Sequence, residues 1–517
     1  MENSKILAVY DVRGIQEYIY KSSKLKDAQG ASTIIKDLIF RALKKVNDDP
    51  NNKLKGELEW YDNNGVVKKY SDNEEFDYQL LYEGGGNAYI LYKNKDIYQN
   101  VNKIMSKYII DETYSLQLVS TFVEKTNNYS NDLHNLILEL AEEKERTNGD
   151  ARLGALPIVK IETNTGLPID KRYNMSIETY KKQSSARKVN TSGIILDNLV
   201  EDKGSNSILA VVHIDGNNMS QRIFDIISEI TNYEDAVYEM RKISYNIKKN
   251  YDDVFNNLSK KYNTIKIGSK IINNAIMKIV VAGDDITYVC PAKLALASVE
   301  TFVKNINKKS MKEDNSGSNR FNFSVCAGIA YFDSHFPFHS AYEIAEKCCL
   351  SAKAKAKSID DFRSPNFVDF HICKNSLQTN NFNKTRENEY ITSFGERLLL
   401  RPYCIETDAF RPNSSKYHDY NNFDNFKTIL DYFQDDEKIS RSRSKELRNG
   451  YSLGEQHIND LITLYSSRGI KFPYKLEYSK KPYIEIFDSE RGEKIKYATW
   501  YDALEILDLY DDFKEVK

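Results

Sequence analysis

The stretch that decides the fold is Val280–Val289, VVAGDDITYV. Two apolar runs rich in strand-forming residues flank a short turn, and this pattern predicts a β-hairpin. A stretch of the same kind, YEGGGNAYIL, lies at Tyr82–Leu91. When the two stretches are aligned, Gly86-Asn87 falls opposite Asp284-Asp285. The chain therefore carries two copies of one hairpin, and only the second copy has carboxylates in its turn.

The same order of elements surrounds both hairpins. An apolar strand precedes each of them: LAVYD ends at Asp11 and VVHID ends at Asp215. Helical patterns and a further strand complete the order β-α-β-β-α-β, which is that of a split βαβ, ferredoxin-like unit. The predicted fold class is α+β, with two ferredoxin-like (RRM-like) domains in tandem and a mostly helical C-terminal domain.

The predicted domain boundaries follow from this repeat. Single helices are expected over Ile15–Leu25 and Ser32–Val46 in the first unit, and over Asn425–Phe433 and Ile458–Tyr465 in the C-terminal domain. A polar stretch with weak periodicity between the two units is expected to be a connector. The predicted domains are a first unit at 1–150 without the Asp-Asp turn, the connector at 151–195, the second unit at 196–375 and the C-terminal domain at 376–517.

Composition excludes several classes of protein. The 517 residues contain 73 Lys+Arg and 75 Asp+Glu, a formal net charge of −2, which excludes a globally basic nucleic-acid coat. No apolar run approaches the roughly 18 residues that a membrane helix needs, and the N-terminal sequence lacks the pattern of a signal peptide. None of the six cysteines forms a C-x-x-C pair, so a cysteine-based zinc site is not expected. We expect a cytoplasmic protein.

Three aspartates form the candidate catalytic site. In a ferredoxin-like sheet the first strand lies beside the central hairpin, so Asp215 is expected next to Asp284 and Asp285. Clustered carboxylates repel one another unless a cation joins them, and hard oxygen ligands suit Mg²⁺ or Mn²⁺. Two such ions can activate a hydroxyl and stabilise a leaving pyrophosphate. The pattern indicates nucleotidyl transfer, although a Gly-Asp turn taken alone is an ordinary polar turn.

Residues near the aspartates are candidate nucleotide ligands. Gly216, Asn217 and Asn218 lead from a strand into a helix, whose first N–H groups can hold a triphosphate; a simple helix cap is the alternative. Lys353 lies near the end of the helix expected over Ala341–Lys357. A lysine there can pair with phosphates, although helix C-termini also attract lysines for dipole reasons alone.

These residues also resemble a known family. The segments VVHIDGNNMSQRI, VVAGDDITYVC and FSVCAGIAYFDSHFPFHSAYEIAEKCCLSAKAKAK look like the second palm domain of the large subunit of type III CRISPR effector complexes, a family related to GGDEF cyclases. GIQEYIYKSSKLKDAQGAS, at Gly14–Ser32, is similar to the first palm. NFVDFHICKNS and LLLRPY, within Asn366–Tyr403, resemble the stretch that follows the second palm.

The resemblance implies two palm domains packed face to face, with ATP in the composite pocket and a cyclic oligoadenylate as product. By match, Asp215, Asp284 and Asp285 take the metal role, and the 3′-hydroxyl of one nucleotide attacks the α-phosphate of another. Implied partners are nucleoside triphosphates, RNA or CRISPR-complex subunits, or a separate messenger-activated effector; a homo-oligomer is a further option, and no membrane is expected. The remaining implied pocket residues are Gly283, Ser32, Gly84, Gly85 and Gly86.

Four features depart from the family pattern. Ala282 replaces the first glycine of the turn, where a positive φ would be strained. Asn217 stands where the family often has a second acid. The family's cysteine zinc motif between the palms is absent, its place taken by Lys160–Gly166, KIETNTG. The first palm starts near residue 5, so no N-terminal HD nuclease domain is expected and the chain resembles a compact, stand-alone relative.

Three functions are compatible with the sequence. The leading hypothesis is a metal-dependent nucleotidyltransferase or cyclase that makes a cyclic (oligo)nucleotide second messenger from ATP in antiviral defence. The alternative is a catalytically weak nucleotide-binding scaffold subunit of an RNA-guided effector complex, which Asn217 and Ala282 would suit. A GGDEF-like cyclase that uses GTP is less favoured, because the hairpin reads Asp-Asp-Ile and the first palm is fused in the same chain.

Overall fold

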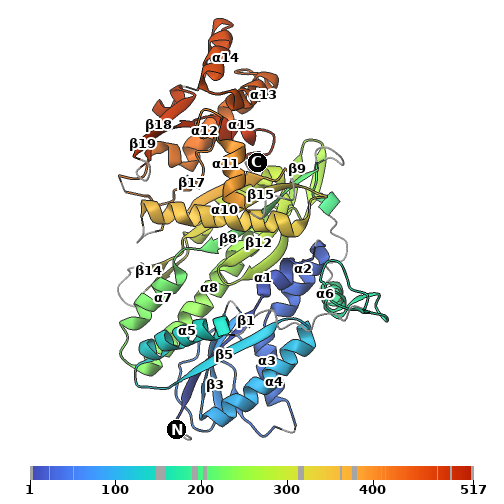
Figure 1. The fold of residues 1–517 in the computed structure, drawn as a ribbon. Helices are drawn as coiled ribbons and strands as arrows, with labels where there is room; N and C mark the ends of the chain where they lie inside the picture. The colour runs from blue at the N-terminus through green and yellow to red at the C-terminus, as the bar shows by residue number, and fades with distance from the viewer. Residues whose placement is uncertain are drawn as a thin grey trace. The chain divides into compact units, whose positions relative to one another are not determined.

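The described part of the chain forms two compact units (Figure 1). The first comprises residues 1–195, 218–253 and 278–286, and the second comprises residues 196–217, 254–277 and 287–517. No described helix is long and apolar enough to cross a membrane. The computed structural model describes residues 4–22, 24–50, 52–84, 86–146, 158–188, 196–201, 207–312, 319–360, 364–374, 381–408, 410–413, 415–473, 475–488 and 492–513.

The first unit is built on a five-stranded sheet with the order β2-β3-β4-β1-β5. Its central strand β1 pairs antiparallel with β4 on one side and β5 on the other, and Asp11 lies directly opposite Asn87. The alternating, largely buried apolar residues of these strands explain why the hairpin and both flanking strands could be predicted. The strands are β1 (Ile6–Arg13), β2 (Gly56–Glu57), β3 (Tyr78–Gly84), β4 (Asn87–Tyr92) and β5 (Gln117–Glu124).

The helices at the start of the first repeat are shorter than predicted. The single helix expected over Ser32–Val46 is wrong: the chain breaks where Asp37 adopts a left-handed φ of 55°. The guanidinium of Arg41 donates to the carbonyl of Ile34 and so satisfies the end of the preceding helix. The helix expected over Ile15–Leu25 is likewise split. The helices are α1 (Ile15–Tyr20), α2 (Leu25–Ile35), α3 (Leu38–Asn47), α4 (Lys95–Thr113) and α5 (Tyr129–Arg146).

The predicted connector contains a helix, α6 (Ile177–Lys188), that packs against α2. Lys182 on α6 is buried and donates to the carbonyl of Tyr18 at 2.6 Å and to Glu178 Oε1 at 2.5 Å. A Cβ on Gly30 would lie 1.8 Å from the carbonyl oxygen of Lys182, so the two helices approach at a distance that only glycine allows. Helix α6 was not predicted because its sequence is polar, although its Lys182 is buried in an ion pair with Glu178.

One carboxylate holds together the segment that contains Lys160–Gly166, which is expected to stand in place of the family's zinc motif. Glu162 accepts hydrogen bonds from the hydroxyls of Thr165 at 2.9 Å and Thr179 at 2.7 Å, and the hydroxyl of Ser176 is bonded to Thr179. Burial alone would raise the pKa of Glu162, but these hydroxyl bonds outweigh it and lower the pKa. The strands that frame this segment are β6 (Ile169–Asp170) and β7 (Met175–Ser176).

The second repeat is built on a six-stranded sheet with the order β11-β12-β8-β15-β16-β17. Strand β8 pairs antiparallel with β15, and β15 pairs parallel with β16, a strand that the sequence did not predict. A Cβ on Gly328 would lie 1.9 Å from the carbonyl oxygen of Ala345, so α10 lies directly on β15. The strands are β8 (Ile208–Gly216), β11 (Met277–Ala282), β12 (Asp285–Pro291), β15 (Val325–Asp333), β16 (Phe367–Ile372) and β17 (Tyr403–Cys404).

One helix, α8 (Tyr233–Lys261), runs from the first compact unit into the second. In the first unit, its buried Arg241 donates to the carbonyls of Leu81 at 2.6 Å, Leu80 at 3.0 Å and Lys68 at 3.1 Å. The pairing of β3 with β4 is irregular between Leu80 and Tyr82, so Arg241 satisfies carbonyls there. The other elements of the second repeat are α7 (Met219–Ser228), β9 (Thr264–Ile267), β10 (Lys270–Asn273), η1 (Leu196–Asn198), η2 (Ala292–Leu294), α9 (Ala295–Ile306), β13 (Ser310–Lys312), β14 (Asn319–Asn322) and α10 (Phe338–Ile359).

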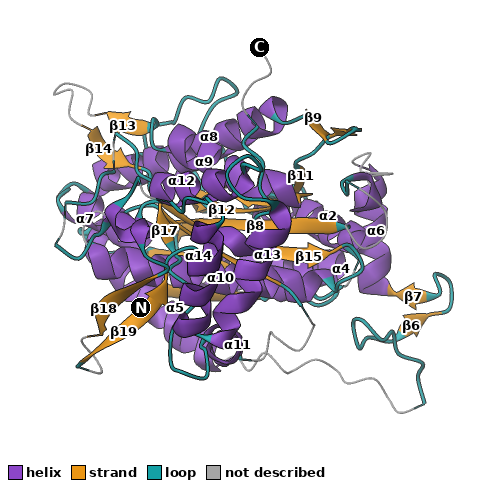
Figure 2. Ribbon diagram, turned by 90° about the horizontal axis from the view of Figure 1, so that it is seen from above, coloured by secondary structure: helices purple, strands orange, loops and turns teal. Residues whose placement is uncertain are grey.

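The C-terminal region is mostly helical, as predicted, and the two expected helical patterns fall within α12 and α14. It also contains an unpredicted hairpin of β18 and β19, drawn in orange in Figure 2. The elements are α11 (Phe382–Tyr390), η4 (Asp419–Asn421), α12 (Phe423–Gln434), α13 (Arg441–Gly450), η5 (Tyr451–Leu453), α14 (Glu455–Ser467), η6 (Glu477–Lys480), β18 (Tyr483–Asp488), β19 (Glu493–Ala498) and α15 (Tyr501–Glu505).

A buried ion network ties this region to β16. Arg401, with a side chain that is 0% exposed, donates to Asp502 at 3.0 Å and to Glu505 at 2.7 Å. Arg386 of α11 holds Asp369 of β16 through two bonds of 2.8 and 2.9 Å. Burial opposes the charge of Asp369, but the two arginines outweigh it and lower the pKa of that carboxyl. The network therefore joins the last strands of the six-stranded sheet to α11 and α15.

Candidate active site

Asp215 lies near the C-terminal end of β8, where its carboxylate forms an ion pair with Lys353 of α10. The Lys353 Nζ to Asp215 Oδ2 distance is 2.5 Å, and the two side chains are about one quarter to one third exposed. Burial alone would lower the pKa of Lys353, but the charge and hydrogen bond of Asp215 raise it above the ordinary value. Lys353 therefore stays an ammonium at neutral pH and neutralises the aspartate.

The second hairpin has the predicted turn. Strand β11 ends at Ala282, β12 begins at Asp285, and Gly283-Asp284 forms the turn between them. Gly283 adopts a φ of 66°, a conformation that favours glycine. Ala282 has no positive φ, so the strain expected from replacing the family's first glycine does not arise.

The structure does not describe the three aspartates as one cluster. Asp215 belongs to the second compact unit, whereas Asp284 and Asp285 belong to the first. Among the residues that the structure describes, no group of three or more His, Cys, Asp or Glu side chains could hold a metal ion. The sheet order does place β12 next to β8. The convergence of the three carboxylates stays a prediction.

The loop after β8 is held in place by Asn217. This buried residue donates from Nδ2 to the carbonyls of Ser364 at 3.1 Å and Pro365 at 3.4 Å, and from its backbone to Ser324 at 2.9 Å. These bonds fix the amide nitrogen, and the buried Oδ1 has no hydrogen-bond donor among the described residues. Asn217 therefore has a structural role, and its Oδ1 is a neutral oxygen that accepts no hydrogen bond from the described residues. Carboxylate and amide oxygens together form a donor set that fits Mg²⁺ or Mn²⁺.

The other predicted nucleotide ligands lie on the same two repeats. Gly216 ends β8, and Asn218 adopts a left-handed φ of 51° immediately before α7. In the first repeat, Ser32 lies on α2, Gly84 ends β3, and Gly86 has a φ of 88° in the turn. Gly85 lies outside the described residues. Binding of a nucleotide by any of these residues stays a prediction.

The sequence missed a second Asp–Lys pair, in the first repeat. Asp11, the counterpart of Asp215, forms an ion pair with Lys144 near the end of α5. The guanidinium of Arg13 also donates to the carbonyl of Lys144 at 2.8 Å. Helix α5 follows the last strand of its repeat as α10 does in the second, so extending the alignment from the strands to these helices would have found Lys144.

The comparisons with known proteins agree with this architecture. The profile of the Cas10/Cmr2 second palm domain matches residues 208–361, which contain Asp215, Lys353 and the acidic hairpin. Residues 208–361 are thus similar to the second palm domain of Cas10/Cmr2. No curated protein sequence matches the chain. The predicted likeness to the large palm-domain subunit of type III CRISPR complexes is confirmed.

Solved structures extend the likeness in fold to nearly the whole chain. A Csm1–Csm4 subcomplex of the type III-A CRISPR-Csm interference complex matches with a TM-score of 0.54 and 13% identity, over 98% of this chain and 70% of that chain. A Csm1–Csm4 cassette in complex with pppApA gives 0.53 and 12%, over 98% and 69%. A cassette in complex with cA4 gives 0.51 and 14%, over 98% and 70%. The predicted fold of tandem palm domains plus a mostly helical C-terminal region is confirmed, whereas the exact domain boundaries stay a prediction.

Proposed function

We propose that this chain is a metal-dependent nucleotidyltransferase that converts ATP into a cyclic oligonucleotide second messenger in CRISPR-type antiviral defence. The observation that carries the proposal is the register of the duplicated hairpin. In the first repeat, Asn87 at the start of β4 lies opposite Asp11 at the end of β1. Asp285 and Asp215 occupy these positions in the second repeat, where β12 neighbours β8. The repeat thus argues that the carboxylates of β8 and the hairpin converge.

Each residue of the site has a role in this proposal. Asp215, Asp284 and Asp285 would hold Mg²⁺ or Mn²⁺, which supplies charge stabilisation at the transferring phosphate. Lys353 keeps Asp215 neutralised and offers an ammonium to a phosphate oxygen. The remaining proposed nucleotide ligands are Gly216, Asn217, Asn218, Gly283, Ser32, Gly84, Gly85 and Gly86.

Each step of the proposed reaction forms one phosphodiester bond and releases pyrophosphate. The 3′-hydroxyl oxygen of one nucleotide bonds to the α-phosphorus of another, the bond from that phosphorus to the bridging oxygen breaks, and the hydroxyl proton passes to solvent. Repetition and ring closure give a cyclic product. The solved Csm1–Csm4 structures with pppApA and cA4 support ligands of this class for the present chain. They also support a Csm4-like subunit as a partner, with RNA and a separate messenger-activated effector as further proposed partners.

Product analysis tests the proposal. Purified protein would be incubated with each nucleoside triphosphate and Mg²⁺ or Mn²⁺, and the products identified by mass spectrometry. We expect an oligoadenylate from ATP and a loss of about a thousandfold or more in the Asp284→Ala/Asp285→Ala double variant. The matched control is Asn87→Ala, which changes the same hairpin position in the first repeat and should retain activity. Equal synthesis by the double variant and the control would overturn the assignment of the site.

A scaffold that binds nucleotide without turnover is the second candidate. Asn217 favours it, because an amide contributes less negative charge to a cation site than the acid that the family often has there. Absence of product with every nucleotide, combined with retained ATP binding and salt-dependent RNA binding, would support the scaffold over the enzyme.

A further inference from the structure

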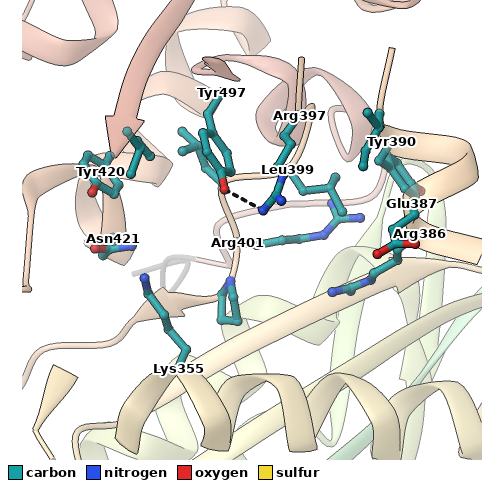
Figure 3. A pocket seen from close by; sticks show the side chains of 14 residues that line it. Lys355, Arg386, Glu387, Tyr390, Arg397, Leu399, Arg401, Tyr420, Asn421 and Tyr497 are labelled. Carbon is teal, nitrogen blue, oxygen red and sulfur yellow. Dashed lines mark hydrogen bonds between the residues drawn. The ribbon is translucent and has the colours of Figure 1, made fainter. Parts of the chain in front are cut away.

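A cavity of about 340 Å³ lies in the second compact unit, away from the residues assigned to the palm site. Its wall is formed by α10, α11, the segment 391–402, η4 and the β18–β19 hairpin (Figure 3). The volume is within the range of small-molecule sites. None of the nucleotide ligands proposed for the palm lines this cavity, so it requires its own explanation.

A cation without an acidic partner projects toward the cavity. Lys355 extends from α10 toward it in Figure 3, and no hydrogen bond or ion pair of its ammonium is found among the described residues. Burial lowers the pKa of Lys355, because nothing nearby compensates for the desolvated charge. Lys353, two residues earlier, pairs with Asp215 instead, so one lysine contacts the aspartate of β8 and the other lines the cavity.

Arg397 supplies a second cation from the opposite wall. Its guanidinium donates to the Tyr497 hydroxyl at 2.8 Å, and Asp488 is 3.7 Å away, which is beyond a normal hydrogen bond. The Arg397 side chain is 31% exposed. Glu387 is the one acid among the described lining residues, and it is exposed. The wall therefore presents more positive than negative charge to a ligand.

Guanidinium N–H groups on the same wall lack acceptors. Arg386 Nε and both Nε and Nη2 of Arg401 are buried without a hydrogen-bond partner among the described residues. The other nitrogens of these arginines are used by Asp369, Asp502 and Glu505. Buried donors without acceptors are costly, and a bound anion or water is the usual explanation. Arg401 Nε also lies 3.7 Å from Asp369 Oδ1, so acids behind the wall largely neutralise these two arginines, and Lys355 and Arg397 are the cations left for a ligand.

Tyrosine rings complete the wall. Tyr420 and Tyr497 are partly exposed, and Tyr390 is buried beside Arg401 with the guanidinium 5.4 Å from its ring. Figure 3 shows Tyr420 with Asn421 at one end of the cavity and Tyr390 at the other. Rings beside cations form surfaces on which a nucleobase can stack while its phosphate is paired.

We propose that this cavity is a second nucleotide site, which binds the phosphate at Lys355 and Arg397 and the base against the tyrosines. The ligand is either a free mononucleotide or one nucleotide of a single-stranded RNA, since both offer a phosphate and an aromatic base. The site does not rest on the proposed synthesis of a messenger, because no residue that lines the cavity is among the nucleotide ligands proposed for the palm.

Binding to the full-length protein tests the proposal. The Asp284→Ala/Asp285→Ala variant would be titrated with AMP, inorganic phosphate and a short single-stranded RNA. In this background, Lys355→Ala/Arg397→Ala should weaken binding of AMP or RNA by about tenfold or more. Lys357→Ala, an exposed lysine on the same helix, is the matched control and should leave affinity unchanged. Lys355→Gln alone, which removes the charge and keeps most of the chain length, tests the site if the double variant unfolds.

Photo-crosslinking with 8-azido-AMP locates the ligand. We expect cross-links to peptides that contain Tyr420 or Tyr497. Tight, salt-dependent RNA binding with weak AMP binding would identify a strand, and the opposite pattern a free nucleotide. Equal affinity of the Lys355→Ala/Arg397→Ala and Lys357→Ala variants would overturn the proposal. So would inorganic phosphate that binds as well as AMP, or cross-links confined to the palm hairpins.

Discussion

The two palm repeats share one ion pair and differ at one turn. Each repeat joins its first strand to its last helix through an aspartate and a lysine, Asp11 with Lys144 and Asp215 with Lys353. At the hairpin, however, Gly86-Asn87 in the first repeat stands where the second has Asp284-Asp285. The Asp–Lys pair is therefore present in a repeat that has no carboxylates in its turn.

This difference separates two roles of the same aspartate. In the first repeat, Asp11 joins β1 to α5 through Lys144, and its opposite neighbour Asn87 carries no charge. In the second repeat, Asp215 joins β8 to α10 and is also the carboxylate that the proposed metal site requires. Lys353 thus belongs both to the packing of the repeat and to the proposed chemistry, whereas Lys144 belongs to the packing alone.

The largest effect is expected where each compact unit has a buried ion network. Arg401→Met leaves Asp502 and Glu505 buried without their cation, which should cost about 3–5 kcal/mol of unfolding free energy. Lys182→Met in the first unit leaves only Glu178, a neighbour on the same helix, and should cost less. Urea denaturation followed by circular dichroism measures both. Equal losses would mean that the number of acids left unpaired does not set the cost.

The second prediction contrasts the two lysines. Lys353→Ala should reduce the proposed oligoadenylate synthesis by about 10- to 100-fold, because it removes both the partner of Asp215 and a phosphate ligand. Lys144→Ala should change synthesis less than about threefold, since its pair lies in the repeat without turn carboxylates. Initial rates at saturating ATP test this, with thermal stability measured alongside. A similar loss in both variants would assign both pairs the same role.

The smallest predicted effect concerns the hairpin of the first repeat. Burial and the nearby Asp37 raise the pKa of Glu83 to about 7, while Lys248 acts in the opposite direction. A carboxyl with a raised pKa stabilises the fold fully at pH below its unfolded pKa of about 4.3, and this stability is lost as the pH rises toward 7. The corresponding residue in the second repeat is Val281, which does not titrate.

We therefore expect the wild type to lose about 1.3 kcal/mol of stability between pH 6 and pH 8 relative to Glu83→Gln. Glutamine keeps the shape and removes the titration, so the difference between the two proteins isolates this group. Melting temperatures of both across this pH range provide the measurement. Parallel pH profiles would show that Glu83 has an ordinary pKa in the folded protein.

Local patterns explain what the sequence could predict. Both hairpins and their flanking strands were identified because turn residues and alternating apolar residues are adjacent in the chain. The break at Asp37 was missed because Arg41 completes the end of α2 through a side chain, which propensity does not register. Helix α6 was missed because its burial depends on Gly30, far away in sequence.

The site was predictable to a similar depth. The residues of the turn identified Asp284 and Asp285 as candidate metal ligands, and the position at a strand end identified Asp215. The sequence predicted Lys353 as a phosphate ligand, which stays a prediction, and the structure adds its ion pair with Asp215. The role of Asn217 in holding Ser364 could not be predicted, because no local pattern links two loops that are so distant in the chain.

The hydrogen bonds that Glu162 accepts have a consequence for the stability of its segment. The hydroxyls of Thr165 and Thr179 close this turn without a thiolate, and the described residues 158–188 contain no cysteine. Alcohols and carboxylates neither form disulfides nor need a loaded ion to keep their shape. The shape of this part of the chain therefore depends on hydrogen bonds alone, and neither removal of zinc nor oxidation of thiols should change it.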